Sequence, residues 1–275
     1  MLKQFSFRKI SAHLVLLFGA VFMVTPFIWS ITTSLKPLEN VFNTPPFQIT
    51  FPLNFDAYIT ILGKINFGLF TMNTFKIAVL ITVGQLITCS MAGYAFARIK
   101  FPGRDFLFIL FLITMMVPAT VTMIPNFILM SKFGWVNTHT GLIIPALASA
   151  FGTFLMRQFF LSFPSDLEDA AKLDGCNPFA FYWRILLPNS KPIMATLGVM
   201  TFQWVWNDFQ WPLIMINSES KRTLQVGLSY LLNENYIDWP VLMAGSVVTI
   251  LPVIILFFFA QKNFVESIKL SGLKG

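Results

Sequence analysis

Six long apolar segments constrain the fold of this chain more than any other feature of its sequence. Each is long enough to cross the hydrocarbon core of a bilayer as a helix, which takes about 20 mainly apolar residues. With approximate boundaries, they cover residues 12–33, 73–97, 106–125, 141–163, 193–217 and 243–261. The predicted fold class is therefore an all-α membrane protein with six transmembrane helices.

The composition supports the bilayer as the solvent. The 275 residues are 56% hydrophobic and only 11% charged, whereas soluble domains are about 25% charged. The net charge of +7 does not indicate a nucleic-acid partner, because the cations flank the apolar segments instead of forming a basic face or arm. The two cysteines and two histidines are too scattered for a disulfide framework or a metal site, so we expect no bound metal.

The distribution of lysine and arginine predicts the orientation. Most of these cations fall in one set of connections, which comprises the N-terminus, residues 98–104, residues 157–191 and the C-terminus. Connections rich in Lys and Arg stay in the cytoplasm. Both termini should therefore be cytoplasmic, in a multi-pass protein of the cell membrane. Residues 1–72 would form an N-terminal span and an extracytoplasmic loop, and residues 73–275 would form the main transmembrane domain.

The connection 164–192, between the fourth and fifth predicted spans, carries strong helix signals. Ser165 and Glu168 have the spacing of a capping box, which predicts a helix start. Gly175 is a natural helix stop, and Asn177 followed by Pro178 predicts the start of a second helix. We expect two short cytoplasmic helices bent at Gly175, the second ending at Pro188.

Two kinds of partner suit the first of these helices. Leu167, Ala170 and Ala171 are expected on one face, where two small side chains would let another protein's backbone approach closely. Alternatively, the helix could lie on lipid. Its acidic first turn would be repelled by anionic lipid, which favours a protein partner.

The same connection resembles the signature loop of the permeases of binding-protein-dependent ABC importers. Asp169-Ala170-Ala171 is followed after three residues by Gly175 and after nine more by Ile185-Leu186-Leu187-Pro188. Asp169 stands where the family usually has Glu. Further likenesses cover nearly the whole chain, at residues 96–104, 141–146, 154–160, 206–213 and 264–275. The last is similar to the tail of maltose-type sugar permeases, which places the chain as the second permease of a heterodimeric pair.

This resemblance implies a non-catalytic permease subunit that takes up a sugar, expected to be an oligosaccharide. Its implied partners are a second, different permease, two ATPase subunits, an external sugar-binding protein and the lipid bilayer. No cofactor would be bound by this chain. ATP and Mg²⁺ would sit on the ATPase, since the sequence lacks a phosphate-binding G-x-x-x-x-G-K-[ST] loop. Alternatives are a permease for glycerol-phosphate or another small polar solute, or a secondary transporter, for which inverted repeats would be expected.

The resemblance also assigns roles to particular residues. Those expected to couple the chain to the ATPase are Glu168, Asp169, Ala170, Ala171, Asp174, Gly175, Ile185, Leu187 and Pro188. A second ATPase contact is expected from the tail residues Ser271, Gly272, Leu273, Lys274 and Gly275.

A polar patch in the fifth predicted span is a candidate for the substrate pathway. Asp208 is a carboxylate within an apolar segment, with Asn207 beside it and Gln203 one turn away. An intramembrane ionisable residue is by default a functional candidate, and amides beside tryptophans suit a sugar ring. The alternative is structural, with Asn207 and Asp208 satisfying backbone groups loosened before Pro212.

Overall fold

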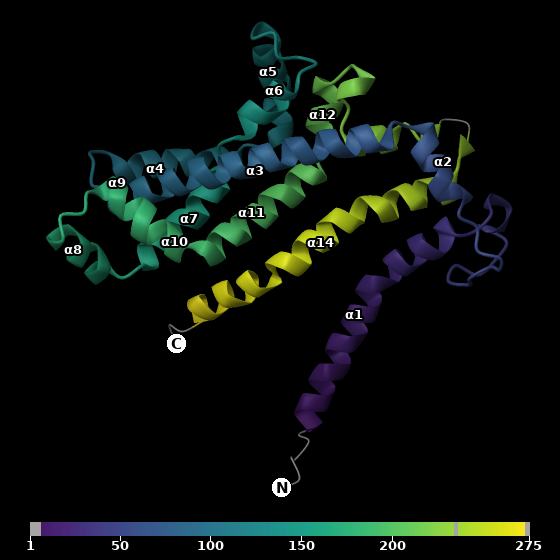
Figure 1. Ribbon diagram of the computed structural model, residues 1–275, viewed down its shortest axis with the longest axis horizontal. Coiled ribbons are helices and arrows are strands. Elements are labelled where there is room, and N and C mark those ends of the chain that lie inside the picture. The colour runs from purple at the N-terminus through teal and green to yellow at the C-terminus, as the bar shows by residue number, and fades with distance from the viewer. Residues whose placement is uncertain (1–6, 234–235, 273–275) are drawn as a thin grey trace. The chain divides into compact units, whose positions relative to one another are not determined.

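The computed structural model describes residues 7–233 and 236–272, which are overwhelmingly helical (Figure 1). Its described strands are the two-residue antiparallel pair β1 (Leu232–Asn233) and β2 (Tyr236–Ile237). The chain divides into two compact units. One contains Met1–Phe67 with Gly227–Leu251, and the other contains Gly68–Val226 with Pro252–Gly275. The boundary expected between residues 72 and 73 stays a prediction.

The first unit contains α1 (Phe7–Ser34), η1 (Leu38–Asn40), α2 (Asp56–Lys64), the second half of α13 (Leu224–Ser229) and the first part of α14 (Trp239–Gly272). The connection after α1 folds back on itself around a buried cation. The ammonium of Lys36 donates to the carbonyl oxygens of Pro45 at 2.8 Å and Pro46 at 3.4 Å. Burial lowers the pKa of Lys36. The hydroxyls of Ser34 and Tyr58, 2.8 Å apart, fix α2 to the end of α1.

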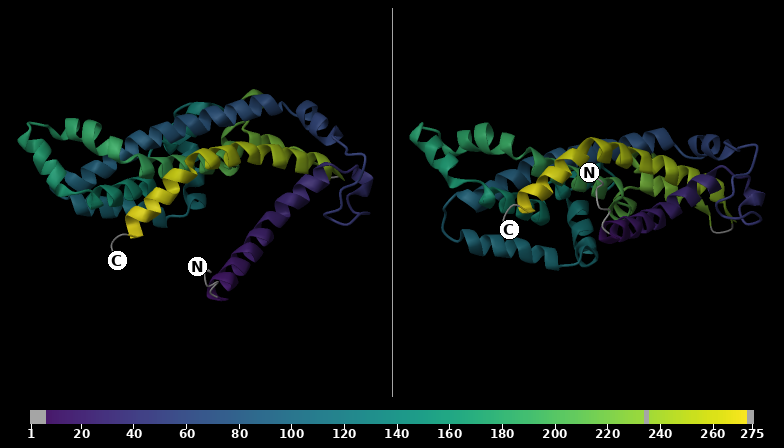
Figure 2. Two further views of the ribbon diagram at one scale, coloured as in Figure 1. Left: turned by 60° about the horizontal axis from the view of Figure 1, so that its bottom comes forward. Right: turned by 90° about the horizontal axis from the view of Figure 1, so that it is seen from below.

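The second unit holds the candidate site. Its helices are α3 (Phe67–Arg98), α4 (Arg104–Ile113), η2 (Thr114–Met116), α5 (Ala119–Lys132), α6 (His139–Ile143), η3 (Ile144–Ala146), α7 (Ala150–Ser162), α8 (Ser165–Leu173), α9 (Pro178–Phe181), η4 (Tyr182–Leu186, a π-helical turn), α10 (Leu187–Asn189), α11 (Lys191–Trp206), α12 (Gln210–Met215) and η5 (Glu219–Lys221). Within this unit, α7 and α11 run beside α3 (Figures 1 and 2).

Glycines bring α3 and α7 into close contact. A Cβ atom at Gly93 of α3 would lie 2.7 Å from the Cβ of Met156 and 3.0 Å from the backbone nitrogen of Arg157. A Cβ at Gly152 of α7 would lie 2.9 Å from the sulfur of Cys89. Small residues allow such approaches between helices in membranes. The buried core around this contact consists of Cys89, Tyr94, Ala97, Met156, Phe160, Ala171, Phe181, Tyr182, Leu186, Ile193 and Leu197.

The structure confirms an all-helical protein with membrane-length helices but does not confirm six spans. Within the described residues, four stretches are long and apolar enough to cross a bilayer: Lys9–Ser34, Phe67–Arg98, His139–Ser162 and Trp239–Phe259. A fifth span would require counting Arg104–Met116 and Ala119–Lys132 together, although they meet at an angle of 100°.

Helix breaks explain the difference from the predicted 106–125 and 193–217 spans. Pro118 has no N–H and disfavours helical geometry at Val117, whose ψ is 116°. The predicted span 193–217 is interrupted at residues 207–209, which leaves α11 with only 16 residues. Hydropathy records the apolar content of both stretches but not these interruptions.

The close contact at Gly93 predicts a position-specific packing defect. Gly93→Ala should destabilise the protein by about 1–3 kcal/mol, because the added methyl meets backbone atoms of α7. Gly198→Ala in α11 is the matched control, since a Cβ there finds only ordinary contacts, the nearest at 3.7 Å. Thermal unfolding in detergent compares the two. Equal melting temperatures for both variants would show that α3 and α7 do not pack as described.

Candidate functional site: the connection between α7 and α11

The first helix of this connection begins at Ser165, as predicted, but without the predicted capping box. Pro164 occupies the N-cap position, and no side chain caps the helix there. The end of α8 follows the prediction. Gly175 has a φ of +77°, its N–H donates to the Lys172 carbonyl at 3.0 Å, and the Cys176 N–H donates to the Ala171 carbonyl at 2.8 Å. These two bonds form a Schellman motif, in which glycine accommodates the left-handed backbone.

The second helix also begins as predicted. The side-chain oxygen of Asn177 accepts the Ala180 N–H at 2.8 Å, with Pro178 in the first turn. The helical stretch ends at Asn189, one residue beyond the predicted end at Pro188. The chain continues through η4 into α10, because a widened π turn precedes the proline, which has no N–H to donate. The side-chain amide of Asn189 donates to the carbonyl of Ile185 at 2.7 Å.

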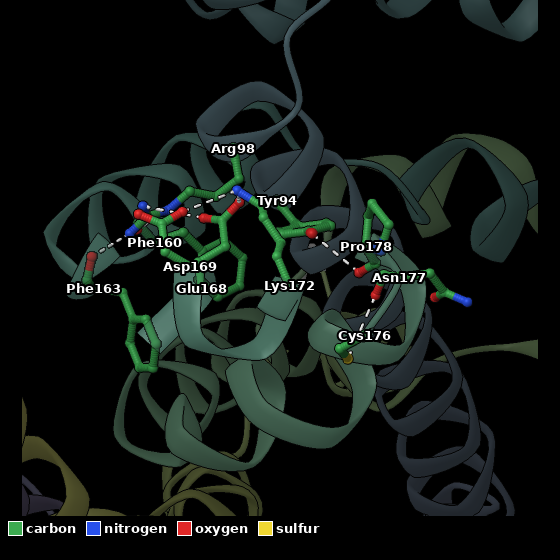
Figure 3. Close-up of polar contacts among 10 residues, drawn as sticks. All are labelled: Tyr94, Arg98, Phe160, Phe163, Glu168, Asp169, Lys172, Cys176, Asn177 and Pro178. Atoms are coloured by element: carbon green, nitrogen blue, oxygen red, sulfur yellow. Dashed lines mark hydrogen bonds and ion pairs between the residues drawn. The ribbon is translucent and has the colours of Figure 1, made fainter. Parts of the chain in front are cut away.

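Arg98, the last residue of α3, joins three segments (Figure 3). Its guanidinium donates to the Phe160 carbonyl from Nε at 3.0 Å and from Nη2 at 2.7 Å, and Nη2 also donates to the Phe163 carbonyl. Nη1 lies 3.4 Å from a carboxylate oxygen of Glu168, and these two side chains are only 13% and 16% exposed. One cation therefore satisfies the negative C-terminal end of α7 and holds the first turns of α8.

Two tyrosines fix the second half of the connection to α3. The Tyr94 hydroxyl donates to the Pro178 carbonyl at 3.0 Å (Figure 3). The hydroxyls of Ser90 and Tyr182 lie 2.7 Å apart, and the rings of Tyr94 and Tyr182 have their centroids 5.3 Å apart. Both short helices are therefore held by hydrogen bonds and ring contacts from one long helix.

A small ion-pair network at the surface of α8 links Lys172 to two carboxylates. Lys172 lies 3.0 Å from Glu168 and 3.3 Å from Asp169. The hydrogen bonds that Lys172 donates to Glu168 and, to a smaller extent, to Asp169 raise the pKa of Lys172. Glu168 thus accepts from both Arg98 and Lys172, which explains why it is unavailable for the capping role that the sequence suggested.

The structure corrects the expected docking face at one residue. Ala171 is only 6% exposed and lies in the core, so the prediction that it shares an exposed face with Ala170 is wrong. One helical step of about 100° separates the two alanines, and Ala171 points inward on the side of Glu168. Ala170 is exposed, with Leu167 at 48% and Leu173 at 90%.

The other residues expected to couple the chain to an ATPase divide between surface and interior. Asp169, Asp174, Gly175 and Pro188 are exposed, whereas Ile185 and Leu187 are half-buried and pack against the core. Of the tail residues, Ser271 and Gly272 belong to the last turn of α14. Leu273, Lys274 and Gly275 lie outside the described residues.

Sequence reasoning missed the residues that hold the connection in place. Arg98, Tyr94 and Ser90 belong to α3 and are 70 to 92 positions away from their main partners. From the sequence, Arg98 is an orientation charge and part of the family likeness at residues 96–104, and no contact is predicted for it. The available signal was its placement directly after the apolar segment, where a guanidinium can reach neighbouring helix ends.

The pathway candidates lie where α11 ends. Gln203 is exposed, and the side-chain amide of Asn207 donates to its carbonyl oxygen at 2.9 Å. This bond supports the structural alternative for Asn207, since it caps the end of α11. Asp208 is half-buried and accepts the Trp211 N–H at 3.5 Å. All three side chains line one open cavity of about 510 Å³.

Comparisons with known proteins agree over nearly the whole chain. The arabinooligosaccharides transport system permease protein AraQ of Bacillus subtilis is 36% identical over 276 residues, which cover 99% of this chain and 98% of that one. AraQ of Halalkalibacterium halodurans is 36% identical over 94% of each chain. The sn-glycerol-3-phosphate transport system permease protein UgpE of Yersinia pestis is 31% identical over 94% of this chain and 95% of the relative.

A solved structure and a family description also match proteins of binding-protein-dependent and ABC transport systems. A chain from a bacterial ABC transporter involved in the import of the acidic polysaccharide alginate superposes with a TM-score of 0.83, at 28% identity, over 93% of this chain and 96% of that one. Residues 86–270 match the family described as "Binding-protein-dependent transport system inner membrane component". The chain therefore belongs to the family of binding-protein-dependent transport system inner membrane components.

Proposed function

We propose that this chain is a permease subunit of an ATP-driven importer for an oligosaccharide, and that the outer face of α8 and α9 docks on a separate ATPase. The AraQ relatives, with 36% identity over almost their full length, support the substrate class. The main support for the docking role is that the two sides of the connection between α7 and α11 differ. Its inner side is fixed by Arg98 and Tyr94, while its outer side exposes large apolar side chains.

We call this outer side the docking face and define it as Leu167, Ala170, Leu173, Phe179 and Trp183. Leu173 is 90% exposed and Phe179 is 66% exposed, and Phe179 stacks edge-on against Trp183 with ring centroids 6.2 Å apart. An exposed apolar patch with a polar rim is typical of a protein interaction site. The exposed carboxylates of Asp166, Asp169 and Asp174 outnumber the exposed cations Lys172 and Arg184, which favours a protein partner over an anionic lipid surface.

The coupling would be mechanical. The ATPase, which would carry ATP and Mg²⁺, moves α8, and the fixed inner side passes that displacement to α3 and α7 without bending the connection. This chain would contribute one half of the translocation pathway and a second, different permease the other half. The docking face and both termini would lie in the cytoplasm, and an external binding protein would deliver the sugar on the opposite side.

A second contact with the ATPase pair would come from the tail, residues 271–275, beyond the docking face. A second candidate substrate is sn-glycerol 3-phosphate, favoured by the 31% identity to UgpE over 94% of this chain. Both candidates keep the same architecture and the same coupling to an ATPase. They differ only in the chemistry of the solute that passes.

The exposed position of Ala170 gives the first test of docking. Ala170→Trp should hold the two surfaces apart at a cost of about 1–3 kcal/mol. That cost corresponds to a loss of association of roughly five- to a hundredfold. The measurement is co-purification of the ATPase with the membrane-inserted permease pair, together with sugar uptake.

Two further alanines serve as controls. Ala12→Trp, an exposed position in α1, should keep the ATPase. Ala171→Trp should instead lower the amount of folded permease, because that side chain lies in the core. Retention of the ATPase and normal uptake by Ala170→Trp would contradict the docking face.

The hydrogen bonds of the Arg98 guanidinium predict a different defect, in the coupling of sugar transport to ATP hydrolysis. Arg98→Gln should leave the Phe160 and Phe163 carbonyls and Glu168 poorly satisfied, at about 1.5–3 kcal/mol for the charged bonds. We expect the ATPase to stay bound but sugar transported per ATP hydrolysed to fall by about tenfold, since 1.4 kcal/mol is a factor of ten.

Lys100→Gln removes an exposed cation two residues away and should leave that ratio unchanged. The measurement is uptake and ATP hydrolysis in the same proteoliposomes. An unchanged ratio in Arg98→Gln would show that Arg98 does not position the connection.

A further inference from the structure

A second cavity in the same unit lies between α3, α5, α11 and α12. Its volume is about 330 Å³, within the range of small-molecule sites in proteins. Asp208, Trp204 and Trp211 form part of its wall at the α11–α12 break, and Asn126 of α5 lies in the wall as well. The indole nitrogen of Trp211 donates to the Gly141 carbonyl at 3.2 Å, which fixes this ring in the wall.

The ionisable group in the described lining of this cavity is acidic. Among its described lining residues, Asp208 is the single ionisable side chain, and the other polar groups are the neutral amides and hydroxyls of Thr74, Thr122, Asn126, Gln210 and Thr223. Proteins recognise phosphate and carboxylate groups with arginine or lysine. An anion entering here would meet a carboxylate and find no cation among the described lining residues.

The wall of this cavity also contains a buried hydroxyl group without a hydrogen-bond partner among the described residues. The hydroxyl of Thr223 is buried and has no hydrogen-bond partner among the described residues. Buried polar groups of this kind are usually satisfied by a water molecule or a ligand. Trp204 is more than half exposed and lines the same cavity as Asp208. The hydroxyl groups of a sugar ring could donate to the carboxylate while its C–H face packs on the indole.

We infer that this cavity is a subsite for a neutral, hydroxyl-rich solute such as a sugar ring, and that Asp208 excludes phosphate and carboxylate anions from it. The inference rests on the proposed importer function and decides between its two substrate classes. Two like charges a few ångströms apart in a partly desolvated site repel strongly. Removing the charge of Asp208 should therefore strengthen the binding of an anion by about tenfold or more.

The test uses the complete importer in nanodiscs, without its external binding protein, so that the pathway alone selects the ligand. Equilibrium dialysis measures the dissociation constants of labelled arabinotriose and sn-glycerol 3-phosphate. The wild-type importer should bind arabinotriose at least about tenfold more tightly than the phosphate. Asp208→Asn should reduce that preference by about tenfold, and Trp204→Ala should weaken arabinotriose binding.

Two variants control for charge and folding. Asp208→Glu keeps the charge and should keep the preference, while Asp56→Asn removes an exposed carboxylate of α2 and should change nothing. The inference is overturned if the wild-type importer binds sn-glycerol 3-phosphate as tightly as arabinotriose. It is also overturned if Asp208→Asn leaves the preference unchanged. A third contradicting result is that the Trp204→Ala importer binds arabinotriose as tightly as the wild-type importer does. Co-purification of the ATPase, measured on the same samples, reports separately on the importer function.

Discussion

The guanidinium of Arg98 is the interaction on which the candidate coupling site depends. It closes the carbonyl end of α7, pairs with Glu168 of α8 and belongs to α3, so three helices meet at one side chain. Because this group is largely buried, removing it would leave two carbonyls without this donor and Glu168 with Lys172 as its remaining cation, which costs more than the bonds themselves contribute. The connection between α7 and α11 is therefore packed into the helical core and is not a loose loop.

Two helices link that connection to the proposed sugar subsite. Arg98 stands at the end of α3, and Thr74, 24 residues earlier in the same helix, lines the 330 Å³ cavity, about 36 Å away at 1.5 Å per residue. The second link is α11, which begins just after α10 and brings Trp204 to the same cavity. The contacts at Gly93 and Gly152 pack α7 against α3 along the way. A displacement of the docking face would reach the cavity through packed helices.

The sequence predicts those helix ends and caps that depend on neighbouring residues. It does not predict features that depend on contacts between residues far apart in the chain. The stop at Gly175 and the cap at Asn177 follow from short-range hydrogen bonds, and the structure has both. The inward position of Ala171 depends on the core built by α3 and α7, which no helical pattern reveals. Hydropathy likewise could not show that the apolar stretch ending at residue 217 breaks after Trp206. The position of Arg98 after an apolar segment indicates that it can reach a helix end, but not which one, since its carboxylate partner is 70 residues away.

The central claim is that the face of α8 turned away from Arg98 contacts the ATPase. Leu173 lies on that face and is 90% exposed, so a photo-crosslinking amino acid at this position should disturb the fold little. The direct measurement is ultraviolet crosslinking in membranes that contain the whole importer, followed by mass spectrometry of the adducts. The structure predicts an adduct to the ATPase from position 173 and none from position 12 in α1. Adducts to lipid alone from position 173 would contradict the claim.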